Sequence, residues 1–484
     1  MNSSIRLLIV TCGLLANSRV FADVPLPRAD RPAYAIVVSH QTLQDEGWNR
    51  VVEVLKAKHS PLVIEFKTTI AETLPELKRA IPKYLCFVAT REEATRDFVA
   101  QAHRLTRQLD DDPYTDCIWA ILTGFDAANA LSIASEKDPL VIRKVASGTE
   151  IALDRCSAGV WFSELQPGLR TRKTATGETK SETGLPDSTR EIAHALTVEK
   201  SQLFVTSGHA TERDWQIGFS YRNGQFVSQG GQLFGVDVKG QKFAIDSDQP
   251  RVYLAVGNCL MGHIDGPDAM ALAFLKSAGV RQMVGYTVLT WYGYAGWGCL
   301  DYFVEQPGRY TLAEAFFANE QALLHRLETL APELLQENPA PGQTVRQIKL
   351  SAAARAAGLS AQDLAGLLHD RDVLALYGDP AWSATMAKGE LAWDQHLTEA
   401  DGVYTFEVQG RAGEKSFAPV NTNGSQRGGR PIIEFLPQRL KNIRILTGTE
   451  WKPVITDNFL LMPLPAQYDA TQKYRITFRG DLCE

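Results

Sequence analysis

Short apolar runs alternate with helix-like segments in the first part of the chain, and this pattern limits the fold more than any other feature. Residues 34–40 (YAIVVSH), 61–66 (PLVIEF) and 84–90 (YLCFVAT) have the length and continuous apolar character of buried strands. The segments after them, such as 43–58, space Leu, Trp and Val as a helix does. Continuous apolar strands separated by helices are typical of a mostly parallel sheet covered on both faces. The sequence therefore predicts an α/β fold.

The same pattern returns later in the chain after an interruption. Residues 166–191 are rich in Thr, Gly, Ser, Lys and Glu, and they predict an exposed loop. Beyond this loop, strands are predicted within 201–209, 251–259 and 281–291, and helices within 268–277, 310–335 and 344–368.

The composition of the chain changes again after residue 387. Short runs with β-branched residues and turn signals between them predict an all-β module of about ninety residues, a small sandwich. The predicted organisation is a signal peptide (1–22), an N-terminal αβ subdomain (23–150), a second, catalytic subdomain (151–388) and a C-terminal β-sandwich (389–484).

The N-terminal segment predicts export. Arg6 precedes an apolar stretch (7–16), and Val20-Phe21-Ala22 offers small residues for cleavage before Asp23, so we expect a periplasmic or extracellular protein. The apolar stretch is too short to span a bilayer, and no membrane span is expected once it is removed. A formal net charge of −6 without a basic stripe argues against a nucleic-acid partner.

Two predicted strands end in residues that can carry chemistry. LFVTSGH ends in His209 and VYLAVGNC ends in Cys259, and strand ends are where sites form in parallel sheets. The His precedes the Cys by 50 residues, an order and spacing found in cysteine proteases. A nearby imidazole activates a thiol and supplies the proton for a leaving amine. The remaining cysteines are sparse and irregularly spaced, which predicts neither a disulfide scaffold nor a structural zinc site.

The segments around these residues resemble the gingipain family of cysteine peptidases. The resemblance rests on Ser207-Gly208-His209-Ala210 followed by Trp215, and on Cys259 followed by Gly262, an Ala-rich helix and a loop with Trp291 and Trp297. WAILTGFDAANALSIAS (119–135) and LYGDPAW (376–382) are also similar to family segments. The family pattern has Gly where this chain has Ala210, and a small residue where it has Asn258.

The resemblance implies a caspase-like α/β/α sandwich followed by an Ig-like β-sandwich, and a secreted endopeptidase that acts on proteins or peptides. It implies Cys259 and His209 as the catalytic pair, Glu164 as a third catalytic carboxylate, and Gly208, Ala210 and Trp291 as oxyanion or substrate-pocket residues. It implies no organic cofactor and allows a structural calcium ion. Because LQPGLRTRK (165–173) after Glu164 has no carboxylate, we expect no strong preference for Arg or Lys at P1.

Two alternatives remain open at this point. The chain could be an exported binding protein that keeps the fold without turnover, because Ala210 and Asn258 depart from the family pattern. It could also be a metal-dependent hydrolase, with Cys259, His263 and His209 as loose candidate zinc ligands, although a closed zinc site needs four.

Overall fold

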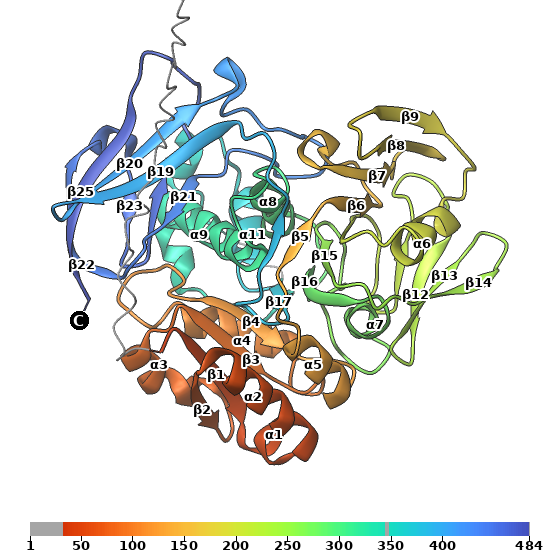
Figure 1. The fold of residues 1–484 in the computed structure, drawn as a ribbon. Coiled ribbons are helices and arrows are strands. Elements are labelled where there is room, and N and C mark those ends of the chain that lie inside the picture. The colour runs from red at the N-terminus through yellow and green to blue at the C-terminus, as the bar shows by residue number, and fades with distance from the viewer. Residues whose placement is uncertain (1–31, 344–347, 484) are drawn as a thin grey trace, which may run out of the picture.

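A central sheet of twelve strands organises the molecule, which the computed structural model describes over residues 32–343 and 348–483 (Figure 1). The predicted signal peptide lies outside the described residues. Ten of the strands form two halves of five, parallel within each half, and an antiparallel hairpin extends the second half. The predicted α/β architecture with a mostly parallel sheet is therefore confirmed.

The first half begins at one edge of the sheet. Its strands, in spatial order, are β2 (Leu62–Phe66), β1 (Tyr34–Ser39), β3 (Tyr84–Val88), β4 (Ile118–Leu122) and β17 (Leu374–Tyr377).

The second half runs in the opposite direction, because its first strand pairs antiparallel with β17. Its parallel strands, in spatial order, are β16 (Val280–Tyr286), β15 (Arg251–Ala255), β10 (Leu203–Thr206), β6 (Lys144–Ser147) and β7 (Ala158–Phe162).

The predicted exposed loop at 166–191 is wrong. This segment contains an antiparallel hairpin of β8 (Leu169–Lys173) and β9 (Thr179–Thr183), which extends the sheet beyond β7, and the start of α6 (Thr189–Thr197). Most side chains of β9 are exposed, so the hairpin has no apolar alternation for sequence reasoning to detect. Ion pairs such as Arg170–Glu182 and Arg172–Glu199 hold it instead.

Helices cover both faces of the first half. On one face, Trp48, Val51 and Leu55 of α2 pack with Ile36 and Val38 of β1. The helices on that face are α1 (His40–Gln44), α2 (Glu46–His59) and α5 (Ala127–Ala134), and those on the other are α3 (Leu74–Ala80, after η1, Ile70–Thr73), α4 (Arg96–Thr106) and α9 (Leu312–Leu330).

The second half is also covered on both faces. Phe274 of α7 (Met270–Ser277) stacks on Tyr253 of β15. On the opposite face, the Tyr286 hydroxyl donates to Asp370 of α11 (Ala361–Asp370) and accepts from the Gly296 N–H of α8 (Tyr294–Phe303).

Smaller elements complete this part of the fold. They are a four-stranded antiparallel sheet of β11 (Asp214–Gln216), β12 (Gln225–Gln229), β13 (Gln232–Val236) and β14 (Lys242–Ile245), the parallel pair β5 (Leu140–Ile142) and β18 (Ala384–Met386), and the short helices η2 (Leu153–Arg155), η3 (Pro332–Gln336) and α10 (Ala352–Ala356).

The residues after 387 form the predicted all-β module. Its two antiparallel sheets are β19 (Trp393–Ala400), β20 (Val403–Gly410), β25 (Tyr474–Leu482) and β22 (Leu440–Thr447), and β21 (Ile432–Phe435), β24 (Phe459–Met462) and β23 (Val454–Ile455), with η4 (Gly413–Lys415) and η5 (Thr449–Trp451) between strands.

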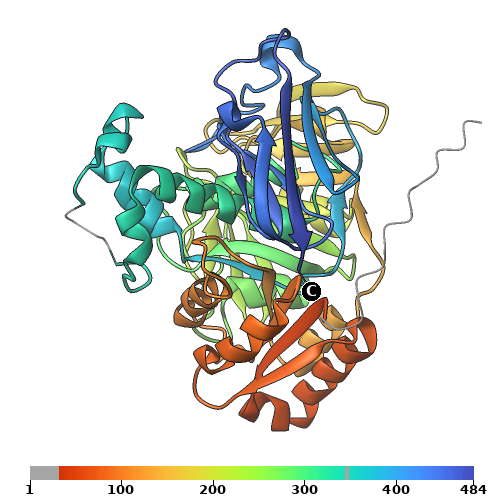
Figure 2. The ribbon, with the colours of Figure 1, turned by 90° about the vertical axis from the view of Figure 1, so that its left-hand side faces the viewer.

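The module shares its core with the rest of the molecule. Residues of both its sheets, including Phe406 and Leu460, form one apolar cluster. Ile433 and Phe459 belong instead to the main core, where Phe459 packs edge-on against Phe317 of α9. Figures 1 and 2 show the blue strands of the module beside the teal helices.

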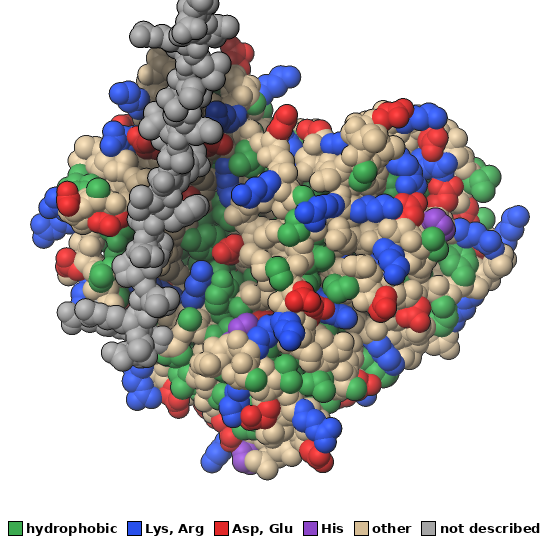
Figure 3. Space-filling view, viewed as in Figure 1, with side chains coloured by type: hydrophobic (Ala, Val, Ile, Leu, Met, Phe, Trp, Pro, Cys, Tyr) green, Lys and Arg blue, Asp and Glu red, His purple; other side chains and the backbone are tan. Residues whose placement is uncertain are grey.

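Charged side chains of both signs are interspersed on the surface shown in Figure 3. None of the helices in the described parts of the chain has the length and apolar character needed to cross a membrane.

Candidate active site

The two predicted reactive residues follow neighbouring strands. β10 and β15 pair in parallel with Thr206 opposite Ala255, so both chains leave the sheet at the same edge. His209 and Cys259 lie in the turns just beyond these strand ends. The fold thus brings the thiol and the imidazole to one part of the sheet edge, as parallel pairing requires.

Asn258 connects the two turns. Its side chain is fully buried, its Oδ1 accepts a hydrogen bond from the Thr206 hydroxyl, and its Nδ2 donates to the Gly208 carbonyl at 3.0 Å. The residue before the Cys is therefore hydrogen-bonded to the residue before the His. This departure from the family pattern has a structural role that a small residue cannot have.

The Cys259 thiol is half-buried and faces the loop that follows β16. The Thr290 N–H donates to its Sγ at 3.2 Å, and the Thr290 hydroxyl donates to the Asn258 carbonyl at 3.1 Å. Leu260 has a φ of 59°, a conformation that is rare for a non-glycine residue and is enriched at functional sites. Its N–H donates to the Val288 carbonyl at 3.0 Å, which holds the turn in place.

The His209 imidazole is exposed and stacks on Phe219, with ring centroids 4.8 Å apart and planes 20° apart. Its ring makes no hydrogen bond with Cys259 or with any other residue of 32–343 and 348–483. Gly208 has a φ of 91°, a region that glycine enters without strain. Ala210 lies outside that region, so replacing Gly there causes no backbone strain.

Glu164 is buried beneath the turn that carries His209. Its Oε2 accepts from the Ser207 hydroxyl at 2.6 Å and its Oε1 from the Thr149 hydroxyl at 2.7 Å. Its carbonyl accepts the N–H of Phe219 at 2.6 Å, the residue on which His209 stacks. Glu164 thus reaches His209 only through Ser207 and Phe219.

Exposed apolar side chains surround the two turns. Trp291 lies beside Thr290 in the loop after β16, and its ring is 5.5 Å from that of His369. Trp297, by contrast, is buried on α8. The exposed apolar residues in the loops next to Cys259, His209 and Glu164 are Leu165 (53% exposed), Phe219 (50%), Leu289 (63%) and Trp291 (41%).

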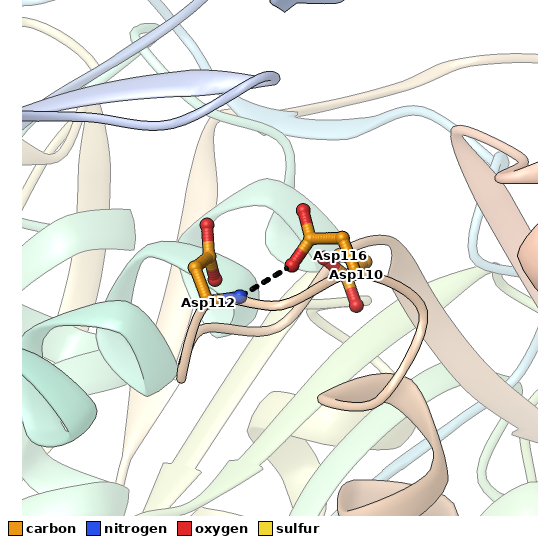
Figure 4. Close-up of side chains that lie close together, drawn as sticks. All are labelled: Asp110, Asp112 and Asp116. Carbon is orange, nitrogen blue, oxygen red and sulfur yellow. Dashed lines mark hydrogen bonds between the residues drawn. The ribbon is translucent and has the colours of Figure 1, made fainter.

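Possible metal ligands lie elsewhere. Among the described residues, the one group of three His, Cys, Asp or Glu side chains with ligand atoms within 4.8 Å of each other is Asp110, Asp112 and Asp116, in the turn before β4. Figure 4 shows these carboxylates and the hydrogen bond from the Asp112 N–H to Asp110. Burial, and then the neighbouring carboxylates, raise the pKa of Asp112 to about 7 and that of Asp116 to about 9.

His263 does not join Cys259 in a metal site. The guanidinium of Arg96 lies against its ring, with nitrogens 2.9 Å apart. Burial and the charge of Arg96 lower the pKa of His263. The predicted alternative of a zinc site at Cys259, His263 and His209 has no support in this geometry.

Sequence reasoning missed the residues that hold this site together. Thr149, Ser207 and Thr290 act through hydroxyl or backbone groups, and no periodicity or motif distinguishes such residues from others in loops. Asn258 was noted only as a departure from a pattern, although a buried amide next to a reactive Cys is a usable signal.

Comparisons with known proteins give weak likenesses only. No protein-family model and no curated protein matches the sequence. Among solved structures, the Arg-specific cysteine proteinase gingipain R superposes with a TM-score of 0.43 at 9% identity, over 90% of this chain and 92% of that one. A second structure, described as a protease, gives 0.34 at 9% identity, over 78% of this chain and 84% of that one. Both scores are below 0.5, and neither assigns this chain a family or an activity.

Proposed function

We propose that the protein is a gingipain-like cysteine endopeptidase with a caspase-like catalytic unit and an Ig-like C-terminal sandwich. The observation that carries this proposal is the placement of a half-buried thiol and an exposed imidazole beyond the ends of adjacent parallel strands, joined through Asn258. A Cys that serves only as core packing needs no His beyond the end of the neighbouring strand. Because a signal peptide is predicted at 1–22, the proposed location of the enzyme is the periplasm or the cell exterior.

The proposed reaction is hydrolysis through a thioester. Cys259 attacks the carbonyl carbon of the scissile bond, and His209 takes the thiol proton and gives it to the departing amine. Water then attacks the thioester with His209 as base, which regenerates the thiol. The Thr290 N–H on Sγ suits this role, since a thiolate accepts a hydrogen bond more strongly than a thiol. The backbone N–H groups of Cys259 and Ala210 are the proposed oxyanion donors.

Glu164 and Gly208 are proposed to position the His209 turn, without contact with substrate. Glu164 accepts a hydrogen bond from the Ser207 hydroxyl, and Gly208 adopts the positive φ that the turn requires. The lack of a hydrogen bond between His209 and Cys259 is compatible with this role, because catalytic hydrogen bonds in free enzymes are often long and tighten when substrate binds.

The exposed apolar residues of these loops suggest the substrate. Phe219, Leu289 and Trp291 offer apolar contact beside the reactive pair, and Arg170 and Arg172, which follow Glu164, are engaged in ion pairs. We therefore predict cleavage after large apolar residues, without a strong preference for Arg or Lys at P1. Profiling a fluorogenic tetrapeptide library tests this P1 preference. A hundredfold preference for Arg or Lys would contradict it, and Glu212→Gln and Asp214→Asn would then locate the acid responsible.

Turnover by variants of the purified protein tests the catalytic pair. Cys259→Ala and His209→Ala should each lower peptide hydrolysis by about a thousandfold or more, and the double variant should be no worse, because the two residues act as a unit. Cys483→Ala is the matched control, since it removes the other half-buried thiol and should leave the rate unchanged. Hydrolysis by Cys259→Ala near the wild-type rate rules out the assignment.

The second candidate is an exported peptide-binding protein without turnover. It is favoured by the His209 ring, which stacks on Phe219 and makes no hydrogen bond to the described residues. Binding of apolar peptides without cleavage by the wild-type protein would support it over the peptidase.

A further inference from the structure

A segment of the C-terminal module, residues 421–428, reaches both sides of the candidate active site. We call these residues the strap. The strap lies between η4 and β21, and its contacts are with residues more than a hundred positions earlier in the chain.

The strap is anchored to α8 by buried ion pairs. The Arg427 guanidinium donates to Asp301 at 2.6 Å and also contacts Glu305, and the Gly428 N–H donates to the second oxygen of Asp301 at 3.1 Å. All three charged side chains are nearly inaccessible to solvent. A buried charge that loses its partner is costly, so this end of the strap has one well-defined position.

The middle of the strap contacts the Cys259 side of the site. Gly424 has a φ of 96° and lies directly on the Trp297 indole, where an added Cβ would be 2.5 Å from two ring atoms. The same indole also meets Gly257, two residues before Cys259, where an added Cβ would be 3.2 Å from its Cζ2 atom. Trp297 therefore contacts both the strap and the Cys259 turn. The Ser425 hydroxyl donates to the Tyr292 carbonyl at 2.8 Å, in the loop that contains Thr290.

The beginning of the strap contacts the Glu164 side of the site. Asn423 Nδ2 donates to the Thr149 hydroxyl at 3.0 Å, and that hydroxyl donates to Glu164 at 2.7 Å. Glu164 in turn receives the hydroxyl of Ser207, next to the His209 turn. A continuous hydrogen-bonded path thus runs from the C-terminal module to the residues around His209.

We propose that the strap is a positioning element of the active site, through which the C-terminal module fixes the Cys259 and His209 turns relative to each other. Asn423 and Gly424 are the positioning residues. The inference rests on the proposed peptidase function, but its physical content is the geometry of the Cys259 turn, which can be measured without turnover. A displacement of about 1 Å in such a turn is enough to lower a catalytic rate a hundredfold.

Two alanine variants of neighbouring glycines test the proposal. Gly424→Ala and Gly429→Ala both place a Cβ on a residue with positive φ, 96° and 65° respectively. Only the Cβ at 424 would clash with another residue, because no heavy atom lies within 4 Å of a Cβ built at 429. We expect Gly424→Ala to lower kcat by about tenfold or more with little change in KM, and to change the rate at which iodoacetamide alkylates Cys259. Gly429→Ala should stay within about twofold of the wild type in all three quantities.

The measurements separate failure of this inference from failure of the proposed function. Equal kcat and alkylation rates in the two variants overturn the role of the strap, whether or not the wild type is a peptidase. A wild type without peptidase activity, whose Cys259 alkylation still responds to Gly424→Ala alone, overturns the function and supports the strap. If Gly424→Ala does not fold, Asn423→Ala and Ser425→Ala carry the same test. The first removes the hydrogen bonds of the Asn423 side chain to Thr149 and Glu150, and the second removes that of the Ser425 hydroxyl to Tyr292. Wild-type values in both overturn the proposal.

Discussion

At the scale of single residues, the candidate site depends on buried polar groups that hydrogen-bond to the turns carrying His209 and Cys259. His209 and Cys259 could be found in the sequence because each follows an apolar run, and strand ends are visible in a pattern of hydrophobicity. Thr290 could not, since its contact with Cys259 joins residues 31 positions apart through a backbone N–H that any residue supplies. The contacts of Glu164 with Thr149 and Ser207 could not be found either, because they join side chains 15 and 43 positions apart that no local pattern links.

Asn258 gives the sharpest prediction at this scale. Asn258→Ala leaves the Gly208 carbonyl without its donor in a fully buried position, so we expect a loss of about 2 kcal/mol in the free energy of unfolding. The His209 turn should also lose its fixed position, which lowers kcat more than it changes KM. Urea denaturation and steady-state kinetics measure the two effects. Asn338→Ala, at an exposed site with one solvent-facing hydrogen bond, is the control, and equal behaviour of the two variants would contradict the role given to Asn258.

At the scale of elements, hydrophobic periodicity identified the buried strands and failed at the edge of the sheet. Predicted strands such as β1 and β16 are almost fully buried, whereas the exposed β8–β9 hairpin is held by ion pairs and backbone bonds. The segment LYGDPAW was noted only for its resemblance to a family segment. In the structure, its Asp379 joins the end of β17 to β1 and α2, by accepting from the Tyr34 hydroxyl at 2.9 Å and from Lys58 and His59.

This junction predicts a pH dependence of stability. Burial disfavours the charged carboxylate, but the hydrogen bond from His59 and the charge of Lys58 outweigh it and lower the pKa of Asp379 to about 2. A depressed folded-state pKa means that the stabilisation is present above the unfolded pKa of about 4 and is lost as the pH falls through about 2. Asp379→Asn should therefore destabilise the protein by about 2 kcal/mol near neutral pH, and by progressively less below pH 4.

Urea denaturation of the wild type and of Asp379→Asn across the pH range measures that difference. Asp138→Asn is a suitable control, because the structure shows only its backbone carbonyl in a contact with the same region. A difference between wild type and Asp379→Asn that stays constant down to pH 2 would show that the charge of Asp379 does not stabilise the fold.

At the scale of the whole molecule, long-range pairing decided what the sequence could not. The two halves of the sheet meet at β17, which comes from residues 374–377 and inserts between β4 and β16. They run in opposite directions because β17 pairs parallel with β4 and antiparallel with β16. Local pattern carries no information on such an insertion. The all-β module was predicted from its short β-branched runs. The contact of Phe459 with α9 and the contacts of residues 421–428 with the candidate site could not be predicted in this way. The strap therefore makes the module part of the proposed active site.

The most direct test of the proposed catalytic pair is covalent labelling of the purified protein with a peptidyl acyloxymethyl ketone that carries an apolar P1 residue. We predict one adduct, located on Cys259 by mass spectrometry, and none on Cys483, which is also half-buried but follows β25 of the C-terminal module. His209→Ala should slow the labelling by about a hundredfold or more, because the imidazole activates the thiol. Labelling of Cys259 at the same rate with and without His209, or labelling of another cysteine instead, would contradict the proposal that these two residues form a catalytic pair.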